Sequence, residues 1–120
     1  MTQRLVVKVT CGVEAPERLS QGVTVAATAV ASGVEVSLWL TGDAVWLAVP
    51  GRVPELELEH ATPLSGLVDS LLDGATVTVC TQCALRRSIG KDDLATGVRI
   101  AGAATFVDEI TRANVQAIVY

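Results

Sequence analysis

Residues 75–87 read ATVTVCTQCALRR, and this stretch decides the fold of the chain. Its first half, 75–80, is rich in β-branched residues and predicts a strand, since Val and Thr favour extended backbone. From Cys80 the pattern becomes helical, and we expect this helix to run to about Ser88. A strand that passes directly into a helix is typical of α/β proteins, whose parallel strands are covered by helices.

The rest of the chain repeats this alternation. Apolar runs predict strands at 5–10, 34–40, 75–80, 97–101 and 115–120. Helical spacing follows Pro16, with Gly33 as its left-handed end, and a second amphipathic helix begins with Thr62 as N-cap and Pro63 at the first helical position. Short helical pieces are expected around 43–47 and 91–94, and a last helix around 104–113. Residues 50–63 are expected to form an irregular surface excursion.

Five strands alternating with helices predict a single α/β domain over residues 1–120. Right-handed crossovers make this a three-layer sandwich with a five-stranded, mostly parallel sheet. For such a sheet we expect the flavodoxin-like strand order 2-1-3-4-5. Ligands would then bind beyond the carboxyl ends of the strands, between the first and the third.

Composition excludes several classes of function. The formal charge of −4 argues against nucleic-acid binding, which needs a basic surface. The apolar stretch 23–40 contains Glu35 and a Ser-Gly break, so it predicts a helix and a strand and no membrane span. The N-terminus predicts no signal peptide, and we expect a cytoplasmic protein. Only 18% of the residues are charged, against an average of about 25%.

This shortage of charge favours a homo-oligomer. We expect exposed apolar surface near Trp39, Trp46 and residues 56–58, where copies of the chain would meet.

Three cysteines are the best candidates for chemistry. Cys11 follows the first strand, Cys80 ends the third, and Cys83 lies on the first turn of the next helix. In the expected strand order all three thiols gather at one edge of the sheet. A helix N-terminus lowers the pKa of a thiol, and Arg86 and Arg87 would add positive potential to stabilise the anion. The alternative is that a buried cysteine is only a small apolar residue, and for Cys11 the two readings stand even.

Other chemistries have less support. His60 is the single histidine and lies in the irregular stretch, so a Cys3His zinc site is disfavoured. The glycines form neither a dinucleotide-binding fingerprint nor a phosphate-binding loop. We therefore expect no metal and no cofactor.

The segment 79–89, VCTQCALRRSI, resembles the DsrE/DsrF-like family, which includes the TusD-type sulfur-relay subunits. The similarity extends over nearly the whole chain, although Cys83 and Ser88 depart from the usual pattern of the relay subunits. The resemblance implies a small α/β subunit that assembles into dimers, trimers or hexamers. It also implies that Cys80 accepts sulfur as a persulfide from a donor protein and passes it to an acceptor protein.

Three functions follow from these observations. The first is a sulfur carrier in which Cys80 is the nucleophile, Cys83 or Cys11 resolves it, and any enzymatic activity is sulfurtransferase-like. The second is a thiol redox module that cycles a Cys80–Cys83 or Cys80–Cys11 disulfide. The third is a non-catalytic subunit of an oligomer.

Overall fold

The computed structural model describes residues 3–120, and all five strands form one parallel sheet. The strands are β1 (Arg4–Val9), β2 (Glu35–Leu40), β3 (Thr76–Cys80), β4 (Arg99–Ala101) and β5 (Val115–Val119). The helices are α1 (Pro16–Ala31), α2 (Leu64–Gly74), α3 (Thr81–Arg86) and α4 (Ala103–Ile110), with the short 3-10 helices η1 (Gly42–Ala48) and η2 (Lys91–Asp93). The predicted α/β class is confirmed.

The order of the strands is β4-β3-β2-β1-β5, which corrects the predicted order 2-1-3-4-5. Strands β1 to β4 are added side by side in one direction, and only β5 returns to the far side of β1. β2 takes the centre, where every residue after Glu35 is buried. Its central place separates β1 from β3, so the two strands predicted to be neighbours do not pair.

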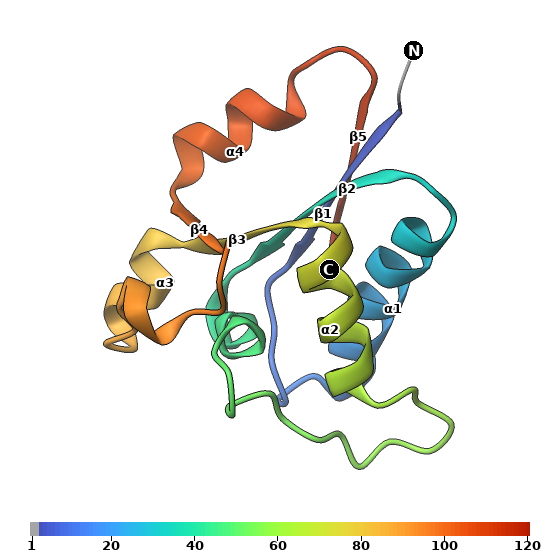
Figure 1. Ribbon diagram of the computed structural model, residues 1–120, viewed down its shortest axis with the longest axis vertical. Helices are drawn as coiled ribbons and strands as arrows, with labels where there is room; N and C mark the ends of the chain where they lie inside the picture. Colours follow the sequence, from blue (N-terminus) through green and yellow to red (C-terminus); the bar gives the residue numbers. More distant parts are fainter. Residues whose placement is uncertain (1–2) are drawn as a thin grey trace.

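The helices lie on both faces of the sheet (Figure 1). Connections between parallel strands are right-handed, so a reversal of direction moves the connecting helix to the opposite face. α1 and α2 pack side by side on one face. α4 connects β4 to β5 across the whole sheet and therefore lies on the other face, which we call the α4 face.

The ends of α1 are set locally, as the sequence predicts. Pro16 occupies the first helical position and Gly33 ends the helix with a left-handed φ of 82°. The start of α2 is one correction. Pro63 is the N-cap, with an extended backbone, so the helix begins at Leu64 and Thr62 lies outside it.

An apolar core fills the space between the sheet and the α1–α2 pair. Alternate residues of each strand point into it, because side chains on a strand alternate between the two faces. Burying one Val or Leu side chain contributes about 1.5–3 kcal/mol, so this layer is a large favourable contribution to the stability of the fold. Its fully or nearly buried members include Val7, Val9, Leu19, Val23, Leu38, Leu40, Leu71, Val77 and Val79.

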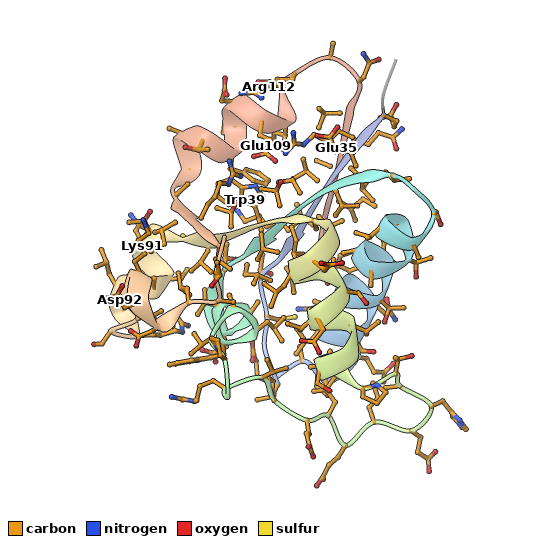
Figure 2. The ribbon with its side chains drawn as sticks, in the orientation of Figure 1. Glu35, Trp39, Lys91, Asp92, Glu109 and Arg112 are labelled. Atoms are coloured by element: carbon orange, nitrogen blue, oxygen red, sulfur yellow. The ribbon has the colours of Figure 1, made fainter. Side chains whose placement is uncertain are left out.

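The α4 face has a polar centre. Glu109 of α4 is only 4% exposed and binds the guanidinium groups of Arg4 at 3.3 Å and Arg99 at 3.2 Å. The indole N–H of Trp39 donates to the same carboxylate at 3.4 Å. Figure 2 shows Glu109 and Trp39 between α4 and the strands. These contacts fix the short α4 to the sheet.

The burial of Trp39 corrects another prediction. Its side chain is 2% exposed and packs edge-on against Phe106 of α4, so it forms no surface for association. Trp46 is half-buried with the Arg52 guanidinium 4.2 Å from its ring centroid. Leu56 and Leu58 are half-buried as well.

Glu109→Gln is predicted to destabilise the protein by about 2 kcal/mol at pH 7, because it removes hydrogen bonds between charged groups in a buried site. Burial raises the pKa of Glu109, but the nearby Ser37 hydroxyl, the hydrogen bond from Arg99 and the charges of Arg4 and Arg99 lower it below its ordinary value of 4.5 overall. A lowered folded-state pKa stabilises the protein above the unfolded pKa, and this stabilisation is lost as the pH falls through the folded pKa. Urea midpoints at pH 7 and pH 3 measure both effects.

The matched control is Glu35→Gln, which removes the exposed partner of the same Arg4. An exposed ion pair contributes less than about 1 kcal/mol. Equal losses in the two variants, or an equal dependence on pH, would show that Glu109 does not anchor α4.

Candidate functional site

Cys80 lies at the junction of β3 and α3, where it is the last strand residue and the N-cap of the helix. Its side chain is partly exposed, whereas Cys11 is 4% exposed and Cys83 is 8% exposed. Cys80 is therefore the thiol that a reagent or a partner can reach most easily.

The pKa of Cys80 lies below its ordinary value. Burial alone would raise it, but the backbone N–H and the thiol of Cys83, the backbone N–H of Gln82 and the charge of Lys8 together lower it. The Cys80 sulfur makes no standard capping hydrogen bond in the structure. The N–H groups of the first turn lower the pKa because they stabilise the thiolate more than the thiol. More Cys80 is therefore thiolate at neutral pH than an ordinary cysteine would be, and the thiolate is the nucleophile.

Cys83 is held under Cys80 by the turn after β2. The backbone N–H of Gly42 donates to the Cys83 sulfur at 3.2 Å. Gly42 has a φ of 55°, and a Cβ there would lie 2.8 Å from the carbonyl oxygen of Thr10. Only glycine fits this turn, and it brings the end of β2 against both β1 and α3. The structure thus unites Cys80 with Cys83, as the Cys-x-x-Cys spacing predicts.

The two arginines predicted to stabilise the anion have different surroundings. The Arg87 Nε atom binds Asp43 at 2.9 Å, and its Nη1 atom donates to the Cys83 carbonyl at 3.0 Å. Arg87 therefore ties α3 to η1, and its charge is already paired. Arg86 is exposed on the last turn of α3. A role for either one at the Cys80 sulfur stays a prediction.

Cys11 follows β1, which does not pair with the strand that carries Cys80. Its sulfur lies 4.0 Å from the carbonyl oxygen of Ala15, and β2 separates its strand from β3. Burial and the nearby charge of Glu14 raise its pKa, against a smaller opposite effect of Arg18. These surroundings suit the small-apolar reading of Cys11 better than a reactive one, and its use as a resolving thiol stays a prediction.

Lys8 is the residue of this site that sequence reasoning missed. It lies on β1 and is half-buried, with its Nζ atom 4.5 Å from the centroid of the Phe106 ring. Its signal in the sequence is a charge inside the otherwise apolar run of residues 5–9. A lysine in an inner strand of a parallel sheet is unusual and marks a position where function is expected.

Among residues 3–120, no group of three or more His, Cys, Asp or Glu side chains is arranged to hold a metal ion. In the same part of the chain, no helix has the length and apolarity to cross a membrane.

The fold and the site define a small α/β protein with a partly exposed thiol of lowered pKa at the carboxyl edge of a parallel sheet. The model of the DsrE/DsrF-like family matches residues 3–116, and the chain belongs to this family. It is 33% identical over 91 residues to the uncharacterized protein MK0008 of Methanopyrus kandleri, an alignment that covers 73% of each chain.

Two solved structures are similar over almost their entire length. The YchN protein of E. coli superposes with a TM-score of 0.78 at 20% identity and full coverage of both chains. MTH1491 of Methanobacterium thermoautotrophicum, a protein of unknown function, superposes with a TM-score of 0.70 at 16% identity, covering 98% of this chain and 99% of its own. At these identities the two structures support the fold.

The three thiols are predicted to react with iodoacetamide at different rates at pH 7, with Cys80 first. Its lowered pKa should place the midpoint of its rate–pH profile below 9.0, and the raised pKa should place that of Cys11 above 9.0. Quenched alkylation followed by peptide mass spectrometry measures each thiol separately. Cys83→Ala should move the Cys80 midpoint upward, since it removes a hydrogen-bond donor, while Cys11→Ala should leave it in place. A Cys80 midpoint at or above 9.0 in the unaltered protein would contradict the assignment.

Proposed function

We propose that this protein is a sulfur carrier in which Cys80 accepts a sulfane sulfur, holds it as a persulfide and passes it to a partner. The observation that carries the proposal is the accessible Cys80 thiol with a lowered pKa at the carboxyl edge of the sheet. Membership of a family that includes sulfur-relay proteins supports the same chemistry.

The loading step is an exchange at sulfur. The Cys80 thiolate attacks the outer sulfur of a donor persulfide, R–S–SH. A new S–S bond forms to Cys80, the donor S–S bond breaks, and the electron pair leaves with the donor thiolate. The product is Cys80–S–SH, which loses a proton to become the persulfide anion. Discharge repeats these steps, with an acceptor thiolate as the nucleophile and Cys80 as the leaving group.

The surroundings of Cys80 suit both directions of this exchange. A stabilised thiolate is a good leaving group, so it releases sulfur readily when an acceptor attacks. The N–H groups at the start of α3 stabilise an anion at Cys80 before and after transfer. The partial exposure of the side chain gives access to donor and acceptor.

The contact with Cys83 favours a second candidate, a redox module that cycles a Cys80–Cys83 disulfide. In that cycle an oxidant removes two electrons and two protons from the pair. The buried Cys83 would then resolve a modified Cys80.

One experiment separates the two candidates. The reduced protein is treated with inorganic polysulfide, desalted, and weighed intact and after digestion. The carrier predicts one or more added sulfur atoms on the Cys80 peptide, and none there in Cys80→Ser. Cys83→Ala should retain the added sulfur, since the carrier needs one thiol. Loss of two hydrogens without added sulfur, abolished in Cys83→Ala, would replace the carrier with the redox module.

We also propose that copies of the chain associate through the apolar residues of β5 and α4. Val107 lies in α4 and is 52% exposed, and Val119 lies in the edge strand β5 and is 61% exposed. Exposed apolar side chains at the edge of a sheet favour association, because burial removes them from water.

Val107→Glu is expected to shift the protein toward the monomer in gel filtration with light scattering, since a buried charge opposes association. Leu85→Glu is the matched control, because Leu85 is 71% exposed on α3. A monomeric unaltered protein at micromolar concentration would refute the proposed association. An oligomer disrupted only by Leu85→Glu would place the contact elsewhere.

A further inference from the structure

Lys8 and Cys80 point to the same face of the sheet from different strands. Lys8 is in register with Trp39 of β2, and Trp39 is in register with Thr78 of β3. Register partners in parallel strands share a face, and so do residues two apart on one strand. Cys80 follows Thr78 by two residues and therefore shares the α4 face with Lys8.

An aromatic pair holds the Lys8 ammonium in place. Its nitrogen lies 4.5 Å from the centroid of the Phe106 ring, within the range of a cation–π contact. The Phe106 ring in turn packs edge-on against the buried Trp39, with centroids 5.2 Å apart. Because Trp39 is anchored to Glu109 of the same helix, the ring under the ammonium is fixed to both α4 and the sheet.

Among the described residues, the arginines of the α4 face are paired. Arg4 and Arg99 both bind Glu109, and Arg99 also donates to the Thr78 hydroxyl. Within residues 3–120, the Lys8 ammonium makes no ion pair and no hydrogen bond, although the residue is half-buried. A half-buried ammonium that contacts only a ring is incompletely solvated, so an anion on this face would be attracted to it.

We propose that Lys8 binds the anionic sulfur carried by Cys80 and that Phe106 positions its ammonium for this task. The inference rests on the proposed sulfur carrier and names what the site selects, which is anionic sulfur donors such as inorganic polysulfide. A persulfide extends the side chain by one S–S bond, about 2.05 Å. Lys8 then stabilises the charge on that outer sulfur, while the N–H groups of α3 act on the sulfur of Cys80 itself.

The loading step with inorganic polysulfide shows where this charge is needed. The Cys80 thiolate attacks a terminal sulfur of the tetrasulfide dianion, and a Cys80–sulfur bond forms. The neighbouring S–S bond breaks and the electron pair leaves with the trisulfide dianion. Two anions meet in this step, so their repulsion slows it unless a cation lies beside them. Lys8 supplies this cation, and no other reactant is required.

The test compares an anionic reagent with a neutral one at the same thiol. Cys80 is alkylated with iodoacetate and with iodoacetamide across a pH series at low salt, and the ratio of the two rate constants is measured by peptide mass spectrometry. Both reagents react with the same thiolate, so the thiolate fraction cancels in the ratio of iodoacetate to iodoacetamide rate constants. The ratio therefore reports the local charge at Cys80. Lys8→Met is expected to lower it by about three- to tenfold, the size of one charge at several ångströms. Added salt should shrink the difference, since salt screens the charge.

Three further variants make the comparison specific. Lys8→Arg keeps the charge and should keep the ratio. Arg112→Met removes one positive charge from an exposed residue past the end of α4, and it should also keep the ratio. Phe106→Leu keeps Lys8 but removes the ring beneath it, and it should give an intermediate ratio. Thermal unfolding of each variant shows that the fold is retained, and Lys8→Arg provides a second comparison if Lys8→Met is unstable.

The outcomes separate this inference from the carrier function. An unchanged ratio in Lys8→Met, or an equal fall in Arg112→Met, overturns the role of Lys8. If the unaltered Cys80 takes up sulfur from polysulfide while the ratio is unchanged in Lys8→Met, the carrier stands and the role of Lys8 fails. If Cys80 takes up no sulfur but the ratio falls only in Lys8→Met, Lys8 is an anion-binding residue and the carrier function fails. A fall in the ratio together with slower polysulfide uptake in Lys8→Met supports both.

Discussion

The right-handedness of crossovers between parallel strands is the constraint on which the rest of the structure depends. Strands β1 to β4 advance in one direction, and their connections leave α1 and α2 on one face. β5 must then return to the free side of β1, and this reversal carries α4 to the opposite face. The two faces consequently differ in character. One face is covered by the paired helices α1 and α2, and the α4 face is covered by the eight-residue helix α4.

A short helix cannot cover a five-stranded sheet by apolar packing alone. The α4 face instead relies on a buried carboxylate shared by two arginines and an indole. Such a cluster holds the helix in one orientation, since displacement would leave Glu109 buried without its partners. The same orientation places Phe106 beneath the Lys8 ammonium. The contacts that attach α4 therefore also shape the surroundings of Cys80.

The three cysteines carry the same thiol group in different surroundings, and these surroundings shift the pKa of Cys80 and of Cys11 in opposite directions. Cys80 meets N–H groups, a thiol and a cation, all of which favour its thiolate. Cys11 meets an apolar pocket and a carboxylate, both of which favour its thiol. Cys83 is buried and contacts both a donor and Cys80. Its sulfur accepts the backbone N–H of Gly42, and its thiol lowers the pKa of Cys80. A site with one partly exposed thiol of lowered pKa and one buried partner suits the proposed transfer through Cys80.

The sequence by itself determined the local elements. Pro16 and Gly33 bound α1 because their backbone preferences act within one or two residues, and the strand-to-helix passage at Cys80 is written in consecutive positions. The family followed from the same segment, because a Cys-x-x-Cys run before two arginines is a contiguous pattern. Only the tertiary structure decided the strand order, which placed β2 between the strands that lead to Cys11 and Cys80 and buried Trp39. It also brought Lys8 to the α4 face. Pairing between strands far apart in the chain depends on the combined burial of all five, and no single segment encodes it.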